Sequence, residues 1–176
     1  PDRVEAKGPP VDEVTTAGWL ICDYYYPARG ERPPVHLTWY DGGMRPAILS
    51  TLRDKNGKPF NFSGGQLFEG DNGMILSDYS RNVLLPADGG LDDRRPDPTI
   101  PASIGHHDEW LQAIRDSGPT TCNFDYSGAL TEAVLLGIVA YRSGETVQWD
   151  GANLRVTNSA KAQEWIHREY RKGWTL

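Results

Sequence analysis

The sequence has few of the features that mark membrane and nucleic-acid-binding proteins. No apolar run approaches the roughly 18 to 20 residues that a membrane-spanning helix requires. Basic residues are in the minority, because 18 Lys and Arg stand against 24 Asp and Glu, for a net charge of −6. Such a chain lacks the positive field that a phosphate backbone or an anionic lipid surface attracts. We therefore expect neither nucleic acid nor a membrane as partner, and the residues indicate no compartment.

The sequence has only two cysteines and none of the common cofactor-binding or catalytic motifs. The two cysteines, Cys22 and Cys122, are far apart and have no metal-ligand spacing, so we expect two buried free thiols. The chain contains no G-x-G-x-x-G, no P-loop, no G-x-S-x-G and no H-E-x-x-H. By itself it therefore lacks the usual means of binding NAD, of serine hydrolysis and of zinc-dependent proteolysis.

Aromatic residues are plentiful instead. Six Trp and eight Tyr supply large burial capacity to a chain in which Leu, Ile, Val and Phe make up only about a fifth of the residues. The length of 176 residues fits one domain of ordinary size. We expect a folded, loop-rich single domain over residues 1–176.

The first strong strand signal covers residues 14–26 and is apolar on both faces. One face carries Trp19, Ile21 and Tyr25, and the other carries Leu20, Cys22, Tyr24 and Tyr26. A strand with one solvated face would alternate between apolar and polar residues. We therefore expect helices on one side of its sheet and another domain or subunit on the other.

Further strands are expected at residues 35–40 and 146–150, and a hairpin in between. Asn72-Gly73 is the pairing that a two-residue type I′ turn requires, so it predicts a hairpin between residues 66–71 and 74–77. Proline and glycine predict loops over residues 44–65 and 86–101.

Three helices are expected in the second half. One begins near Ser103 and ends before Gly118, with His107 on a buried stripe that also holds Trp110, Leu111 and Ile114. The second covers residues 127–142. Its core, residues 133–141, is apolar all round, and such a helix belongs in the middle of the fold. Its Gly137 predicts close packing against another backbone. The third extends from residue 158 or 159 to Gly173.

The order of these elements predicts the fold class. Strands come first, followed by two helices, a strand and a helix, without the strand-helix alternation of a parallel sheet. We expect an α+β fold with an open, mainly antiparallel sheet. Helices would pack on one face, and the other face would be available for oligomerisation.

His106 and His107 form the densest group of candidate site residues, together with Gly105, Asp108 and Glu109 at a helix start. Adjacent helical positions point about 100° apart, so the two imidazoles are poorly placed to bind one metal ion together. Contact with a polar ligand and a structural or surface role both stay open. Because His107 shares the expected buried stripe, we expect its loss to lower stability and the loss of His106 to lower turnover.

Tyr40 and Asp41, in the segment Trp39-Tyr40-Asp41-Gly42-Gly43, are the second candidate. An aromatic face followed by a carboxylate suits a sugar, whose C–H face stacks and whose hydroxyls need acceptors. The plainer interpretation is a core Trp, a half-exposed Tyr and a turn Asp.

Several segments, in this order, resemble the C-terminal domain of Gfo/Idh/MocA oxidoreductases over nearly the whole chain. They are Leu37-Thr38-Trp39-Tyr40-Asp41-Gly42-Gly43, Leu67-Phe68-Glu69-Gly70-Asp71, Gly105-His106-His107 with Glu109-Trp110, Asn123-Phe124-Asp125-Tyr126, Leu130-Thr131-Glu132-Ala133-Val134-Leu135-Leu136-Gly137, and Tyr170-Arg171-Lys172-Gly173-Trp174.

The resemblance implies a larger enzyme. An N-terminal Rossmann domain would bind NAD or NADP, and hydride would pass between the nicotinamide and a sugar or polyol carbon. That family's nucleotide loop, Lys-Pro pair and catalytic Asp/His segment precede the region that begins at Pro1. We therefore expect a fragment that holds no catalytic residue and binds no cofactor or metal, and the loop dipeptide Lys58-Pro59 receives no catalytic role.

Three functions remain in view. The first is the substrate-binding and oligomerisation domain of an NAD(P)-dependent oxidoreductase, with His106, His107, Tyr40 and Asp41 facing a sugar-like substrate. The partners would be the Rossmann domain and further copies of the chain, joined through the sheet. The second is a free-standing carbohydrate-binding or assembly module. The third is a small hydrolase or lyase acting through the two histidines, which no nucleophile or metal set accompanies.

Overall fold

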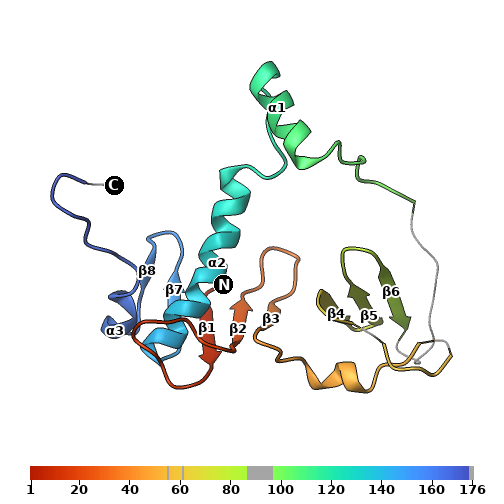
Figure 1. Ribbon diagram of the computed structural model, residues 1–176, viewed down its shortest axis with the longest axis horizontal. Coiled ribbons are helices and arrows are strands. Elements are labelled where there is room, and N and C mark those ends of the chain that lie inside the picture. The colour runs from red at the N-terminus through yellow and green to blue at the C-terminus, as the bar shows by residue number, and fades with distance from the viewer. Residues whose placement is uncertain (55, 61, 87–96, 175–176) are drawn as a thin grey trace. The chain divides into compact units, whose positions relative to one another are not determined.

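The computed structural model describes residues 1–54, 56–60, 62–86 and 97–174. The chain divides into two compact units, one formed by Pro1–Arg45 with His107–Leu176 and the other by Pro46–His106. Each unit is built from its own elements, coloured along the chain in Figure 1. That both units make up one domain stays a prediction.

The first unit contains a five-stranded antiparallel sheet in the order β3-β2-β1-β7-β8. Its strands are β1 (Arg3–Lys7), β2 (Ile21–Tyr26), β3 (Val35–Tyr40), β7 (Val147–Asp150) and β8 (Arg155–Val156). β1 lies in the middle, where it pairs with β2 on one side and β7 on the other. The sheet therefore joins the beginning of this sequence to residues near its end.

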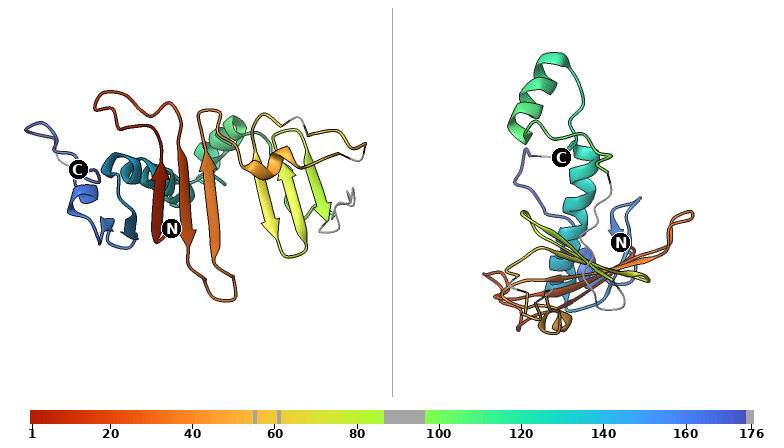
Figure 2. Two further views of the ribbon diagram at one scale, coloured as in Figure 1. Left: turned by 90° about the horizontal axis from the view of Figure 1, so that it is seen from below. Right: turned by 90° about the vertical axis from the view of Figure 1, so that its right-hand side faces the viewer.

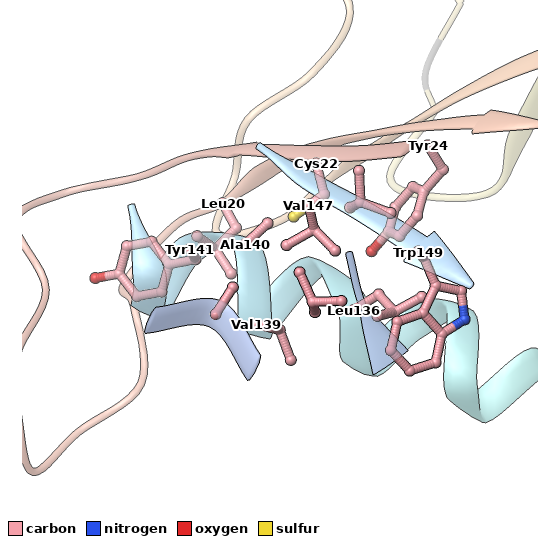
Figure 3. Packing of buried hydrophobic residues seen from close by; sticks show 12 residues of the cluster. Leu20, Cys22, Tyr24, Leu136, Val139, Ala140, Tyr141, Val147 and Trp149 are labelled. Carbon is pink, nitrogen blue, oxygen red and sulfur yellow. The ribbon is translucent and has the colours of Figure 1, made fainter. Parts of the chain in front are cut away.

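Helix α2 (Phe124–Ser143) packs against β1, β2 and β7 and supplies one layer of the core. Asn123 caps its start, and Gly144, in the left-handed conformation, ends it. Figure 3 shows the side chains that α2 and the sheet bury between them. The buried cluster consists of Val4, Leu20, Cys22, Tyr24, Leu136, Val139, Ala140, Tyr141, Val147, Trp149, Val156 and Ala162.

Only the C-terminal half of α2 is buried. Its buried residues begin at Leu136, and the preceding apolar side chains are exposed. Figures 1 and 2 show the N-terminal half extending beyond the sheet. The expectation of a buried core over residues 133–141 is therefore wrong for Val134 and Leu135, which are exposed, whereas burial begins at Leu136.

Gly137 is close to side chains rather than to another backbone. A Cβ at this position would lie 2.3 Å from Tyr24 Oη and 3.0 Å from Cys22 Sγ. The predicted close approach is present, but its partner is β2's tyrosine and cysteine.

The two faces of the sheet differ in polarity. Cys22 and Tyr24 point toward α2, and this side is called the inner face below. The outer face carries Ile21 and Asp23 from β2 and, opposite them in register, Lys7 and Glu5 from β1. The expectation of an apolar second face is therefore wrong, because β1, which the sequence analysis missed, adds charged residues there.

Residues 14–20 are not part of β2, contrary to the long strand expected over 14–26. The Asp12 carboxylate accepts hydrogen bonds from the backbone N–H groups of Val14 and Thr15. The Arg142 guanidinium donates to the Asp12 and Thr15 carbonyls. These bonds use backbone groups that a strand would need for its ladder.

Helices α1 (His106–Asp116) and α3 (Ala160–Gln163) begin close to the expected positions. α1 buries none of its residues, so the expected buried stripe is absent and His107 is exposed. α3 is much shorter than expected. The N–H groups of Trp165 and Ile166 bond three residues back, which tightens the last turn and ends the helix.

The second unit is a three-stranded antiparallel sheet of β4 (Gln66–Gly70), β5 (Gly73–Ser77) and β6 (Asn82–Pro86), preceded by the 3-10 helix η1 (Ala47–Ser50). The expected hairpin is present with a shifted turn. Gly70 pairs with Gly73, so the turn residues are Asp71 and Asn72, neither of which has a positive φ. Leu76 and Leu85 are buried in this unit.

The α+β class with antiparallel sheets is confirmed. Of the expected loop over 86–101, residues 87–96 lie outside the described residues, and 97–101 have no helix or strand. Cys22 is buried as expected, whereas Cys122 is exposed. Among the described helices, none is long and apolar enough to cross a membrane.

Candidate functional site

Tyr40 and Asp41 lie together at the end of β3. Tyr40 is half-buried on the outer face, opposite Ile21 of β2. The Asp41 backbone N–H bonds to the Leu20 carbonyl at 2.9 Å, and its carboxylate accepts from the Gly42 N–H at 2.6 Å. Gly42 and Gly43 both have positive φ, and a Cβ on Gly42 would collide with the Gly18 carbonyl. The turn therefore fixes Asp41 and presents Tyr40.

His106 and His107 lie at the start of α1, and both side chains are exposed. Gly105, with a φ of +98°, turns the chain into the helix. The expectation that His107 is buried is wrong, because its side chain is exposed. The prediction that His107 mainly supports stability depended on that burial. The histidine pair and the Tyr40-Asp41 pair belong to different elements, so the structure gives two local pairs and not one assembled site.

Glu109 connects α1 to the segment that leads into α2. Its carboxylate accepts hydrogen bonds from the Thr121 backbone N–H and the Thr121 hydroxyl. These bonds lower the pKa of Glu109, with the backbone bond as the larger cause. Glu109 is therefore an ionised structural link next to the histidine pair.

The outer face of the sheet holds a polar network that the sequence analysis did not single out. Asp23 Oδ1 lies 2.8 Å from His36 Nε2 and accepts a hydrogen bond from the Thr38 hydroxyl at 2.7 Å. The Asp23 side chain is 19% exposed, whereas that of His36 is 51% exposed. One shielded carboxylate thus orients two accessible polar groups on the edge strand of this sheet.

Planar side chains continue this network across three strands. The Tyr25 and His36 rings are stacked with centroids 4.5 Å apart and an interplanar angle of 6°. The Arg3 guanidinium lies over Tyr25, 3.7 Å from its centroid, and is paired with Glu5 at 3.6 Å. We call these six residues the outer-face cluster: Arg3, Glu5, Asp23, Tyr25, His36 and Thr38.

His36 on one side and Arg3 on the other occupy both faces of the Tyr25 ring, so the outer-face cluster presents ring edges and hydrogen-bonding groups on this face of the sheet. Tyr40 shares this face, since it is two residues beyond Thr38 on the same strand. The alternation of His36, Thr38 and Tyr40 with apolar neighbours in the sequence was enough to predict that these three side chains share one face of the strand. That Arg3 and Glu5 lie on the same face could not be predicted, because β1 was not recognised as a strand.

Cys22 and Tyr24 are ionisable residues buried under the sheet, on its inner face. Burial raises the pKa of the Cys22 thiol and, further, that of the Tyr24 hydroxyl. Both groups stay protonated at neutral pH and pack against Gly137. Among the described residues, no group of three or more His, Cys, Asp and Glu side chains could hold a metal ion.

Comparisons of this chain with protein-family models, curated proteins and solved structures find no match.

Proposed function

We propose that this chain is the substrate-binding and oligomerisation domain of an NAD(P)-dependent oxidoreductase that acts on a sugar, polyol or glycoside. In this proposal, a separate Rossmann domain supplies NAD or NADP and the catalytic groups. His106, His107, Tyr40 and Asp41 face the substrate, and copies of the chain associate. The motifs that resemble Gfo/Idh/MocA oxidoreductases, in the same order along the chain, are the main support.

The observation that carries the proposal is the accessibility of the motif residues. Both histidines are exposed at the start of α1, and Tyr40 is half-exposed beyond the Asp23-His36-Thr38 hydrogen bonds. The α+β fold with antiparallel sheets also agrees with the fold that the resemblance implies.

A free-standing carbohydrate-binding or assembly module is the second candidate. The Tyr25 and His36 rings, with Asp23 and Arg3 beside them, favour it because they gather aromatic and hydrogen-bonding groups on one face of the sheet without any cofactor. On this alternative, binding would involve the outer-face cluster and would be independent of the two histidines at α1.

The first experiment titrates the isolated chain with NADH and NADPH by calorimetry. We expect no binding, because the sequence has no glycine-rich phosphate loop. A micromolar dissociation constant for either cofactor would contradict the fragment proposal.

The second experiment separates the two candidates by saturation-transfer NMR with a panel of polyols and aldoses. If the chain is the oxidoreductase domain, His106→Ala and Tyr40→Ala weaken the sugar signals. In a protein that also contains the proposed Rossmann domain, His106→Ala lowers turnover. If the chain is a free-standing module, Tyr25→Ala weakens the sugar signals and His106→Ala leaves them unchanged. Both histidines are exposed, so melting temperature should stay within about 2 °C of the unchanged chain for either histidine variant.

A further inference from the structure

The imidazole of His36 is fixed by its neighbours on the outer face of the sheet. Its Nε2 lies 2.8 Å from Asp23 Oδ1, and its ring stacks on Tyr25 with centroids 4.5 Å apart. The Arg3 guanidinium covers the other face of Tyr25, so that ring is fixed in turn. Asp23 is anchored by the Thr38 hydroxyl, which donates to Oδ1 at 2.7 Å. These contacts give the imidazole one defined orientation.

The contact with Asp23 also determines which ring nitrogen of His36 carries the proton. A carboxylate only accepts hydrogen bonds, so the neutral imidazole has its proton on Nε2. Nδ1 then carries a lone pair, and none of the described residues bonds to it. The His36 side chain is 51% exposed and that of Asp23 is 19% exposed, so the imidazole is the accessible member of the pair.

A histidine that is oriented by a carboxylate can act as a general base. The lone pair on Nδ1 of His36 can take a proton from a ligand hydroxyl, and the negative charge of Asp23 stabilises the imidazolium that forms. Proton transfer by a positioned side chain typically contributes about 10²–10⁴-fold to a rate. The pair therefore has the parts of a catalytic unit for proton transfer.

The position of Thr38 limits the chemistry of this pair. Its hydroxyl is bonded to Asp23 and lies 3.4 Å from Nε2 of His36, away from the base at Nδ1. It is therefore not placed as a nucleophile that Nδ1 could activate. The pair offers a ligand one proton acceptor on an open face, which suits a reaction that proceeds by proton transfer alone.

Ring opening of a cyclic aldose is such a reaction. A base takes the proton of the O1 hydroxyl, the C1–O1 bond becomes a carbonyl, the C1–O5 bond breaks, and O5 takes a proton from water. Closure on the opposite face of the carbonyl reverses these steps, and O1 takes its proton back from the protonated base. The product is the other anomer, and the base and the water are regenerated without oxidation or group transfer.

We propose that His36 and Asp23 catalyse the interconversion of the α and β anomers of an aldose. Nδ1 of His36 takes the O1 proton, and Asp23 holds the imidazole in the required tautomer. Arg3 and Glu5, with side chains 41% and 37% exposed, offer hydrogen bonds to further hydroxyls of the sugar. The inference rests on the proposed function for the sugar class of the ligand alone, and it needs neither the Rossmann domain nor NAD or NADP.

Polarimetry of freshly dissolved α-glucose and α-galactose tests this activity with the chain as it stands. The reference is free imidazole at four times the concentration of the chain, which matches its four histidines. We expect the chain to bring the sugars to anomeric equilibrium at least about tenfold faster than this reference, because a positioned base acts at a high effective concentration. A rate equal to that of free imidazole would overturn the inference.

Three variants test the assignment to the pair. His36→Ala should abolish the acceleration. Asp23→Asn should reduce it at least about tenfold although the imidazole is kept, because the amide can donate to Nε2 and move the ring proton to Nδ1. His167→Ala is the matched control, since His167 is an exposed histidine of the same unit, and it should keep the full rate. Acceleration that survives His36→Ala would overturn the assignment.

The tautomer of His36 can be measured independently of any activity. All three altered residues lie outside the buried cluster of the first unit, and circular dichroism confirms that the variants fold. Nitrogen-15 NMR of the imidazole rings should show His36 with its proton on Nε2 in the unchanged chain and on Nδ1 in Asp23→Asn. A proton on Nδ1 in the unchanged chain would overturn the inference.

The outcomes also separate this inference from the proposed function. If the chain does not accelerate anomer interconversion but binds sugars in a manner that His106→Ala weakens, the inference fails and the oxidoreductase proposal stands. Acceleration that depends on His36, together with a micromolar dissociation constant for NADH, supports the inference and contradicts the fragment proposal.

Discussion

At the scale of the residue, the contact around Gly137 shows how closely α2 and β2 approach. The absent side chain leaves room for the Tyr24 hydroxyl, which donates to the Val134 carbonyl at 3.5 Å. Glycine inside a helix costs about 1 kcal/mol relative to alanine. At position 137 this cost is accepted because only glycine leaves room for the Tyr24 side chain.

Gly137→Ala is expected to destabilise the chain by about 1–3 kcal/mol, because the new methyl group would overlap Tyr24 Oη and crowd Cys22 Sγ. Gly128→Ala is the matched control in the same helix, where a Cβ meets nothing within 4 Å. It should stabilise by up to about 1 kcal/mol. Urea unfolding measures both. Equal effects at the two positions would contradict the packing account.

The buried Cys22 and Tyr24 make the chain sensitive to alkali. Burial raises both pKa values above their ordinary 9.0 and 10.0, so above about pH 9 the unfolded chain loses protons that the folded chain keeps. The stability from these groups is therefore complete only below about pH 8 and is lost as the pH rises above it.

We expect the free energy of unfolding to fall between about pH 8 and pH 10.5, and to fall less in Cys22→Ala and in Tyr24→Phe. Cys122→Ala is the control, since Cys122 is exposed and should leave the alkaline slope unchanged. Urea titrations at a series of pH values give the slopes. Parallel slopes in all four proteins would exclude the two buried groups as the cause.

At the scale of the element, the two halves of α2 are stabilised in different ways. Its C-terminal half is held by packing, and its N-terminal half depends on local bonds, foremost Asn123 Oδ1 accepting from the Tyr126 N–H at 3.0 Å. Removing a cap of this kind costs about 0.5–2 kcal/mol.

Asn123→Ala should increase hydrogen exchange over residues 124–130 and leave residues 136–143 protected. Asn123→Asp keeps an acceptor and places a negative charge at the helix N-terminus, so exchange should stay near that of the unchanged chain. Exchange mass spectrometry resolves the two halves. Loss of protection along the whole helix in Asn123→Ala would mean that α2 behaves as one cooperative segment.

The elements differ in how far they could be predicted from sequence. β3 and the end of α2 were predictable because the alternation over residues 35–40 and the glycine at 144 act locally. β1 was missed because Arg3, Glu5 and Lys7 are polar, and its central place depends on partners far along the chain.

The candidate site shows the same limit. The positions of Tyr40 and Asp41 followed from the strand and its glycine turn. The helix of His107 was also predictable, but burial of its stripe was not, because burial requires a surface to pack against. The outer-face cluster needs the register of three strands, which no single segment contains.

At the scale of the whole molecule, the two units have separate cores. Leu136, 2% exposed, belongs to the core of the first unit, and Leu76, 1% exposed, to the core of the second. The second unit is continuous in sequence, whereas the first is assembled from segments on both sides of it.

Leu76→Ala and Leu136→Ala, the same change in each core, should each cost about 2–5 kcal/mol locally. We expect faster hydrogen exchange in the second unit alone for Leu76→Ala, and in the first unit alone for Leu136→Ala. Acceleration in both units by either variant would show that the cores unfold together.

The central position of β1 affects the order of events during synthesis. β1 leaves the ribosome about 140 residues before its neighbour β7. At about 5–20 residues per second, that delay is roughly 7–28 s. During this time the hairpins of β4, β5 and β6 can already close, while one side of β1 has no partner. The interrupted unit is therefore the later of the two to fold, and its β1 edge is the part of the nascent chain that a chaperone would need to shield.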